Sequence, residues 1–257
     1  MTAPHDPPPC DDITPPTIGV YADIPDADYR KWDAVSKSDL DSFVNPRKPK
    51  GRNMLIGSVL HAMLLEGAIA TSERYASSPE FDLRTKEGKA GFAAFEAKTG
   101  KLAIRPKEKL QIAAMYHAVR NHEDAVKIID AEGQNEVSVI GQLEGFSVMS
   151  RARIDMVRRG CISDLKTTGE RDAGAFKNSK AKFKYNVQAA YYGDLHAQVS
   201  GEGYMPFVHI CVSSRPDPET DEHEVWVEEM GWDEVAYGRQ HYEDLLILYE
   251  RKHNEGK

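Results

Sequence analysis

The stretch 151-RARIDMVRRGCISDLKTT-168 decides the fold, because strand-like segments lie on both sides of a tight turn and each contains an acidic residue. Apolar and polar residues alternate in both segments, and Arg159 and Gly160 occupy the turn. A connection this short predicts antiparallel strands. Facing positions on such strands are about 5 Å apart, so Asp155 and Asp164 should be neighbours.

Two carboxylates at that separation repel each other unless a divalent cation lies between them, and oxygen ligands suit Mg²⁺ or Mn²⁺. Because side chains alternate along a strand, Asp164 and Lys166 project from the same face. This arrangement suits phosphodiester hydrolysis, in which the metal polarises the phosphate and the lysine orients or deprotonates the attacking water. An isolated D-x-K pattern would more often be an ordinary cross-strand salt bridge.

The surrounding sequence predicts an α/β protein with a mixed central β-sheet flanked by helices. A hairpin begins at Glu136 and runs into the quoted strands, with a turn at Leu143-Glu144-Gly145. Helical periodicity and capping residues predict five helices, from Ser36 to Pro46, Arg52–Gly67, Lys107–Ile129, Asn186–Val199 and Trp232–Asn254. Two further strands are expected at Tyr204–Ser213 and His223–Met230.

The composition is that of a globular protein, with 40% hydrophobic and 29% charged residues among 257. Residues 1–19 are rich in proline and are expected to form a disordered leader before a single domain over 20–257. No apolar run reaches the roughly 20 residues that a membrane helix needs, and no signal peptide precedes the domain, so we expect a cytoplasmic location and no membrane partner. Cys10, Cys161 and Cys211 are too few and too scattered for a four-cysteine metal site.

Charge is unevenly distributed along the chain, whose net charge is -8. Residues 151–190 contain ten Lys and Arg against four Asp and Glu, a local charge of +6. Residues 217–257 contain thirteen acidic and four basic residues. The basic segment is a candidate DNA-binding surface in which Lys182 and Lys184 are nominated as contacts. The acidic region is expected to face solvent or to meet a basic neighbour in an oligomer.

Three motifs in order resemble the core of the PD-(D/E)XK, or restriction-endonuclease-like, nucleases in their RecB-like form. They are Arg151-Ala-Arg-Ile-Asp155, Asp164-Leu-Lys166-Thr-Thr and Gln188-Ala-Ala-Tyr-Tyr192. Ile154 stands where the motif name has proline, a position that supplies no ligand. The segments Val35-Ser-Lys-Ser-Asp-Leu40, Gly57-Ser-Val-Leu-His61-Ala and Pro79-Glu-Phe-Asp narrow the resemblance to RecE-type exonucleases, meaning exonuclease VIII and its phage relatives.

The resemblance implies a catalytic site that holds two metal ions, Mg²⁺ by preference with Mn²⁺ as a substitute. Asp155 and Asp164 would be metal ligands, the Leu165 carbonyl a backbone ligand, and Lys166 the catalytic lysine. His61 matches the histidine that holds a second metal in RecB-like nucleases, although a buried helix histidine often has a purely structural role. For Glu136, two interpretations are equally supported: a metal ligand, and a charged residue at the end of a strand.

Gln188 and Tyr192 share one face of the predicted helix, and the resemblance implies that they support the site and position the DNA strand. Core packing is the alternative for Tyr192. Arg151 and Arg153 alternate with Asp155 along one strand face, so they either contact phosphate or neutralise the carboxylates. For Ser36 and Lys37 at the first helix, phosphate binding competes with plain helix capping by Ser36.

Together these features predict an exodeoxyribonuclease that degrades linear double-stranded DNA from 5′ ends and leaves 3′ single-stranded tails for recombination by strand annealing. The 5′ to 3′ direction, the duplex preference, a homo-oligomeric ring and a RecT-like annealing partner are implied by the resemblance alone. The alternatives are another RecB-like nuclease, single-strand-specific or endonucleolytic, and a catalytically silent DNA-binding or scaffold protein of the same fold.

Overall fold

The computed structural model describes residues 17–22, 24–45 and 51–255. Almost all of the predicted leader, and Pro46 at the expected end of the first helix, lie outside these residues. The first strand begins at Gly19, the last residue of the predicted leader. Among the described helices, none has the length and apolar character that crossing a membrane requires.

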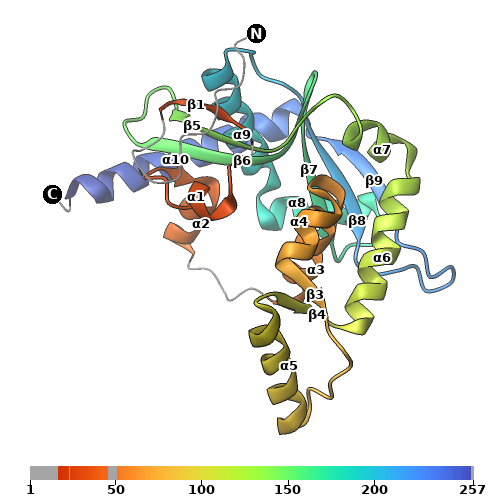
Figure 1. Cartoon of the computed structure of the whole chain (residues 1–257). Helices are drawn as coiled ribbons and strands as arrows, with labels where there is room; N and C mark the ends of the chain where they lie inside the picture. Colours follow the sequence, from red (N-terminus) through yellow and green to blue (C-terminus); the bar gives the residue numbers. More distant parts are fainter. Residues whose placement is uncertain (1–16, 23, 46–50, 256–257) are drawn as a thin grey trace.

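A mixed central sheet organises the chain, as the sequence predicts (Figure 1). Its strand order is β1-β5-β6-β7-β8-β9, and β2 pairs with β6. The β2/β6 and β7/β8 pairs are parallel, and the other neighbours are antiparallel. The strands are β1 (Gly19–Tyr21), β2 (Val35–Ser36), β5 (Gly133–Gln142), β6 (Met149–Arg158), β7 (Cys161–Thr168), β8 (Phe207–Ser213) and β9 (Val225–Glu229). A separate two-stranded sheet pairs β3 (Tyr75–Ser77) with β4 (Leu102–Ile104).

Helices cover both faces of the sheet, and each layer of helices has its own apolar core. In the first core, α2, α9 and α10 pack on the sheet, and in the second α3, α6 and α7 do so. The helices are α1 (Asp26–Tyr29), α2 (Lys37–Val44), α3 (Arg52–Leu65), α4 (Gly67–Arg74), α5 (Lys86–Thr99), α6 (Pro106–Asn121), α7 (Glu123–Ile129), α8 (Ala173–Phe183), α9 (Tyr185–Ser200) and α10 (Trp232–Glu255). Helix α5 buries none of its residues and projects away from the rest of the molecule (Figure 1).

The two cores meet along β6 at the level of Asp155. Ile154 packs in the first core and Met156 packs in the second. The sheet register pairs Val137 with Ile154 on one side of this level and Asn135 with Met156 on the other. Glu136 lies between those pairs, so it faces Asp155 across the hairpin. The packing therefore holds this part of β6 between two layers and fixes where the acidic side chains lie.

Some predicted elements differ from the structure. The helix expected over Lys107–Ile129 is two helices, because the chain turns at His122, whose imidazole accepts a hydrogen bond from the Ala125 amide and caps α7. The helix expected to close at Gly67 ends at Leu65. Gly67, at a φ of 87°, instead begins α4. Helices α5 and α8 lie in segments for which the sequence analysis predicted no helix.

The acidic C-terminal region partly meets the basic segment within the same chain. Lys180 on α8 forms ion pairs with Glu228 and with Glu234, the second at 2.9 Å. These acids belong to β9 and α10, which pack beside α8 and α9. The expectation that the acidic region faces only solvent or another subunit is therefore wrong for this part of it, because a basic neighbour lies in the same subunit.

Candidate metal and catalytic site

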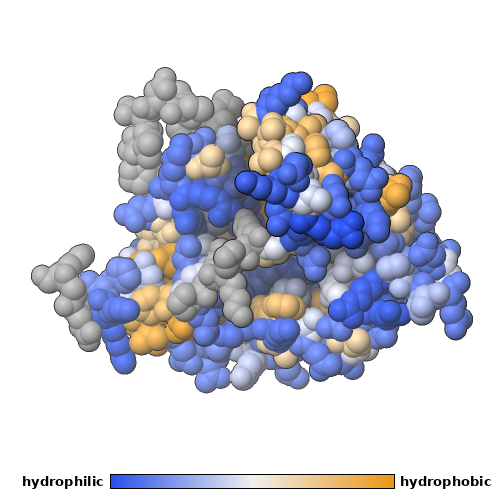
Figure 2. Space-filling model, turned by 90° about the horizontal axis from the view of Figure 1, so that it is seen from below, coloured by the Kyte–Doolittle hydropathy of each residue, from blue (hydrophilic) through white to orange (hydrophobic). Residues whose placement is uncertain are grey.

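One open cleft brings most of the predicted site residues together. It encloses about 800 Å³, and its lining includes residues of α3, the hairpin, β7 and the start of α9. Seen from below, the molecule is hollowed near its middle, and largely hydrophilic residues surround the hollow (Figure 2). The predicted residues that line the cleft are His61, Glu136, Arg153, Asp155, Asp164, Leu165, Lys166 and Gln188.

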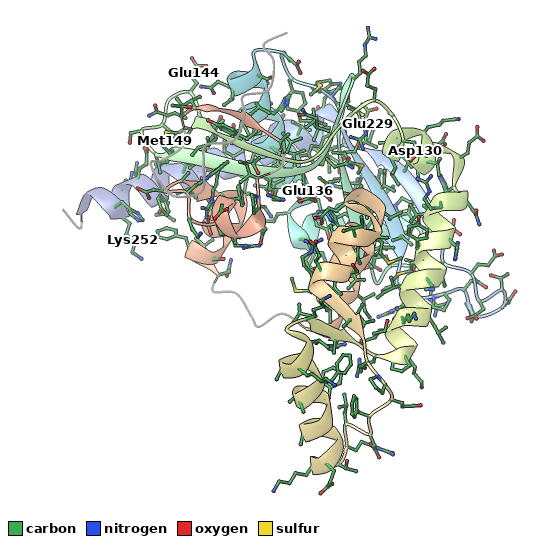
Figure 3. The ribbon with its side chains drawn as sticks, in the orientation of Figure 1. Asp130, Glu136, Glu144, Met149, Glu229 and Lys252 are labelled. Carbon is green, nitrogen blue, oxygen red and sulfur yellow. The ribbon has the colours of Figure 1, made fainter. Side chains whose placement is uncertain are left out.

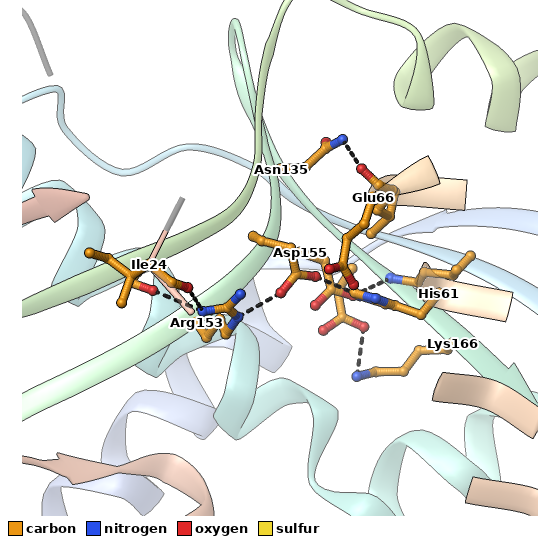
Figure 4. A network of polar contacts seen from close by, with 12 residues as sticks. Ile24, His61, Glu66, Asn135, Arg153, Asp155 and Lys166 are labelled. Atoms are coloured by element: carbon orange, nitrogen blue, oxygen red, sulfur yellow. Dashed lines mark hydrogen bonds and ion pairs between the residues drawn. The ribbon is translucent and has the colours of Figure 1, made fainter. Parts of the chain in front are cut away.

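Three of these side chains form a compact cluster from three different elements (Figure 4). The Nε2 atom of His61 on α3 lies 3.1 Å from Asp155 Oδ2 and 3.3 Å from Glu136 Oε1. One candidate ligand atom from each residue lies within 4.8 Å of the others. In the part of the chain that the structure describes, this is the one group of three such residues arranged to hold a metal ion.

Glu136 reaches the cluster through an unusual backbone conformation. Its φ is 54°, in the left-handed region that residues other than glycine rarely adopt. Arg153 Nε donates a hydrogen bond of 2.6 Å to Glu136 Oε2, and Arg153 Nη1 donates to the Ile24 carbonyl. Figure 3 shows Glu136 near the centre of the molecule, whereas Glu144, at the turn of the same hairpin, lies at the periphery. Backbone strain of this kind persists where the surroundings enforce it and is common at functional sites.

The donor set fits a divalent cation. Glu136 Oε1 is buried, and its one polar neighbour among the described residues is the imidazole of His61, which also faces Asp155. A metal ion in place of the imidazole proton would bind both carboxylates as well as His61. Oxygen and imidazole donors together suit Mg²⁺, Mn²⁺ and related divalent ions.

A second group of side chains lies beside this cluster. Lys166 Nζ lies 2.6 Å from Asp164 Oδ2 and donates a hydrogen bond of 2.9 Å to Gln188 Oε1. The amide of Gln188 closes the triangle, because its Nε2 donates to Asp164 Oδ1 at 2.6 Å. Both Asp164 and Lys166 project from β7 on the side where α9 lies, which explains why Gln188 reaches them. Asp164 thus faces the lysine and does not join the three-residue cluster.

Burial and neighbouring charges raise the pKa values of His61 and Asp164 and lower that of Asp155. Burial opposes the charged form of His61, but Asp155 and Glu136 outweigh it and raise the pKa of His61 to about 9. Burial and the charge of Asp155 raise the pKa of Asp164 to about 6, although Lys166 opposes the shift. Burial also raises the pKa of Asp155, but His61 and Lys166 outweigh it, so the net direction is downward. Without a metal, His61 is therefore a cation between two carboxylates at neutral pH.

Leu165 and Tyr192 lie close to the site in different ways. The Leu165 amide donates a hydrogen bond of 2.9 Å to Asp155 Oδ2, which orients that carboxylate. Tyr192 packs against the first core, and burial raises the pKa of its phenol. Its neighbour Tyr191 is fully buried and donates a hydrogen bond to the Val35 carbonyl.

The predicted contacts at the first helix have structural partners. Ser36 caps α2 through a capping box with Asp39, so the capping interpretation describes its geometry. Lys37 is largely buried and forms an ion pair of 2.7 Å with Asp41. Arg151 donates hydrogen bonds to three backbone carbonyls and to Asp39 Oδ2. These three side chains are already engaged within the fold.

Lys182 and Lys184 have different surroundings, although the sequence nominates them together. Lys182 is exposed, and its Nζ lies 5.3 Å from the centre of the Phe183 ring. Lys184 Nζ lies 2.8 Å from His241 Nε2 on α10. Lys184 also lines a different cavity, between α8, α9 and α10. The structure therefore leaves Lys182 free and turns Lys184 away from the cleft that holds His61 and Lys166.

The sequence prediction missed three aromatic residues of the cleft, Tyr75, Phe183 and Tyr185. Lys166 Nζ lies 4.7 Å from the centre of the Tyr185 ring. The sequence signal was present, because the run Lys182-Phe-Lys-Tyr185 alternates cations with aromatic rings. Proteins that bind single-stranded nucleic acid combine cations and aromatic side chains in one groove.

Comparisons with known proteins show what the chain resembles in sequence and fold. Residues 32–250 match the family described as a PDDEXK-like domain of unknown function (DUF3799). A solved structure from Eubacterium rectale, named "Putative exonuclease", has 15% identity and a TM-score of 0.50, over 85% of this chain and 75% of that chain. This likeness supports the fold alone.

A structure from Haemophilus somnus 129PT, named "phage related exonuclease", has 11% identity and a TM-score of 0.33, over 80% of this chain and 100% of that chain. A likeness this distant carries no argument about the chain. Among curated proteins the comparison found no match.

Proposed function

The chain belongs to the family of PDDEXK-like domains matched over residues 32–250, and we propose that it is a metal-dependent exonuclease that degrades linear double-stranded DNA. The family match confirms the predicted PD-(D/E)XK resemblance and fold. One observation carries the proposal: the His61–Glu136–Asp155 cluster and the Asp164–Lys166–Gln188 group line the same open cleft. A cation site beside a half-buried lysine suits phosphodiester hydrolysis.

His61, Glu136 and Asp155 would hold a divalent ion, Mg²⁺ or Mn²⁺. When bound, this ion supplies positive charge to the phosphate and lowers the pKa of water. Asp164 and the Leu165 carbonyl are proposed to complete the ligand set, including that of a second ion. Arg153 balances the charge of Glu136 and keeps this carboxylate oriented toward the cluster.

Lys166 is proposed as the catalytic lysine that orients the attacking water and offsets charge that develops on the phosphate. Burial alone would lower its pKa, but Asp164 and other neighbours raise it, so the amine is protonated at neutral pH. Gln188 holds both Asp164 and Lys166 in place through two hydrogen bonds. Tyr192, one turn further along α9, is proposed to support this arrangement by packing.

Lys182 is the proposed DNA contact with the best access to solvent. Lys184, Lys37, Arg151 and Ser36 would contribute indirectly, since each has a partner within the fold. The further proposals are cleavage from 5′ to 3′, 3′ tails for strand annealing, a homo-oligomeric ring and a RecT-like partner. Their support is the resemblance to RecE-type exonucleases.

The test is incubation of the purified protein with end-labelled linear duplex and with closed circular duplex, with and without Mg²⁺. We expect short labelled products from the linear duplex with Mg²⁺, and an intact circle. Duplexes labelled at the 5′ or the 3′ end separate the two directions of cleavage. Cutting of the circle would identify an endonuclease, and DNA binding without cleavage at any metal concentration would indicate a DNA-binding protein instead.

A further inference from the structure

The joint between α8 and α9 has an unusual geometry. Helix α8 ends at Phe183 and α9 begins at Tyr185, so Lys184 alone connects them. Lys184 has φ 54° and ψ 48°, the left-handed conformation that L-residues with a side chain rarely adopt. This single residue brings the rings of Phe183 and Tyr185 together, with centroids 5.8 Å apart and planes at 27°. The joint therefore stacks two aromatic rings at the start of α9.

Tyr185 connects this stack to the catalytic lysine. Its ring lies 5.7 Å from the ring of Phe176, which is fully buried, and 5.5 Å from that of His209. The Nζ atom of Lys166 lies 4.7 Å from the centre of the Tyr185 ring. The buried rings of Phe176 and His209 pack against Tyr185. Tyr185 is therefore fixed in place, and it holds Phe183 at a fixed position beside the site. The stack is therefore part of the wall of the cleft.

Phe183 presents a large apolar surface to that cleft. Its side chain lines the cleft, and 49% of the residue is exposed, although Tyr185 stacks against it. An exposed cation lies beside it, because Lys182 Nζ is 5.3 Å from its ring centre, while the buried Lys37 donates a hydrogen bond of 3.4 Å to its carbonyl and pairs with Asp41. Proteins bind single-stranded nucleic acid with this combination, in which bases stack on aromatic rings while cations hold the phosphates.

We propose that Phe183 is a stacking platform for a nucleobase of the strand being cleaved, and that Tyr185 is its support. This inference rests on the proposed nuclease function and adds a specific contact to it. A base stacked on Phe183 would join an aromatic stack whose other ring, that of Tyr185, lies next to Lys166. Stacking would therefore help to position the neighbouring phosphate in the cleft. The contact uses only the face of the base and is therefore independent of sequence.

The test compares Phe183→Ala and Phe183→Leu with the wild type on two oligonucleotide duplexes. One duplex is intact, and the other has an abasic residue at the first or second position from the end that is cleaved. On the intact duplex we expect Phe183→Ala and Phe183→Leu to weaken binding in Ca²⁺ by about 10- to 100-fold. On the abasic duplex, wild type and variants should agree within about threefold, since no base remains to stack.

A matched control is Tyr237→Ala, which truncates another exposed aromatic residue. Tyr237 is 67% exposed on α10 and lines the separate cavity beside Lys184. Its truncation should leave binding to both duplexes unchanged. An equal loss by Phe183→Ala on the intact and the abasic duplex would show a structural role only and would overturn the inference, as would no loss on either duplex.

A Phe183→Trp variant separates this inference from the proposed nuclease function. Tryptophan preserves the stacking surface, and its fluorescence should be quenched by single-stranded oligonucleotides whether or not the protein cleaves them. Quenching without any cleavage would support the platform and contradict the nuclease. Cleavage by the wild type with no quenching, and with equal losses on both duplexes, would support the nuclease and contradict the platform.

Discussion

The cleft has two halves that differ in how their charges are satisfied. The metal half consists of His61, Glu136 and Asp155, in which one imidazole lies between two carboxylates from separate elements. The lysine half consists of Asp164, Lys166 and Gln188, which pair with one another. The proposed metal ion would replace the proton of the imidazole in the metal half, whereas Lys166 already balances the charge of Asp164 in the lysine half.

This difference separates two aspartates that face each other on adjacent strands. The pKa of Asp155 is lowered, because His61 and Lys166 outweigh its burial, while burial and the charge of Asp155 raise the pKa of Asp164 to about 6. Neighbouring carboxylates whose pKa values are pushed apart commonly have different roles in a site. We therefore expect substitutions in the two halves to affect metal binding and turnover differently.

The largest effect is expected from Asp155→Ala. It removes a ligand from the metal half, so Mn²⁺ affinity should fall by at least about 100-fold and turnover by at least about 1000-fold. Asp164→Ala should weaken Mn²⁺ binding less, by about tenfold, because the three-residue cluster remains. Calorimetric Mn²⁺ titration measures both variants, with Asp130→Ala, a surface ion-pair residue, as the control. Equal losses of Mn²⁺ affinity would mean that the two halves are one metal site.

We expect Lys166→Ala to have a smaller effect on Mn²⁺ binding and a large effect on turnover. The substitution removes the cation of the lysine half, and turnover should fall by about 100- to 1000-fold. Mn²⁺ affinity should stay within about threefold of the wild type, because Lys166 does not belong to the cluster. Single-turnover cleavage at saturating Mn²⁺ gives the rate. A variant that lost affinity in proportion to turnover would remove the distinction between the halves.

Metal affinity should also depend on pH through His61. Its pKa is about 9 without metal, so between pH 6.5 and 8.5 the cation must displace a proton from the imidazole. Affinity for Mn²⁺ should therefore rise with pH, by about tenfold per unit and about 100-fold over this range. Titrations in buffers with different ionisation enthalpies count the released proton. In His61→Gln the affinity should be lower and nearly independent of pH, and an unchanged pH slope would exclude His61 from the metal half.

The sequence predicted the proximity of Asp155, Asp164 and Lys166 for a local reason, whereas Gln188 was nominated through the resemblance. A short turn fixes how β6 meets β7, so the proximity of Asp155, Asp164 and Lys166 follows from residues 151–168 alone. His61 and Glu136 were found through the resemblance, because α3 and β5 reach the site from elsewhere in the chain. The left-handed conformation of Glu136 has no signal in the sequence.

The particular side-chain bonds between distant segments could not be predicted. Gln188 was expected to support the site, but its hydrogen bonds to Asp164 and Lys166, and the ion pairs of Lys180 with Glu228 and Glu234, have no local signal. These contacts exist only after α8, α9 and α10 pack together. Helix α5 could have been predicted from the sequence. Thr85 caps its start and Gly100 ends it in the left-handed conformation, and both residue types are recognised signals of helix ends.

The smallest effect separates Lys182 from Lys184. Lys182→Glu should weaken duplex binding in Ca²⁺ and flatten its salt dependence by about one unit of slope, because a free cation is lost. Lys184→Glu should change the slope less, because Lys184 contacts His241 outside the cleft. Reversal of Asp221 and Glu222 to lysine is the control and should barely alter the affinity. An equal change of slope for both lysines would mean that DNA also follows the cavity beside α10.

An anomalous difference map from crystals soaked in Mn²⁺ would locate a metal ion in the cleft directly. We expect a peak within about 2.5 Å of His61 Nε2 and of one carboxylate oxygen from both Glu136 and Asp155. The Nζ atom of Lys166 should remain outside the coordination shell and beside Asp164. A strong peak that His61 and Glu136 do not touch, or no peak in the cleft at saturating Mn²⁺, would contradict the assignment of the metal half.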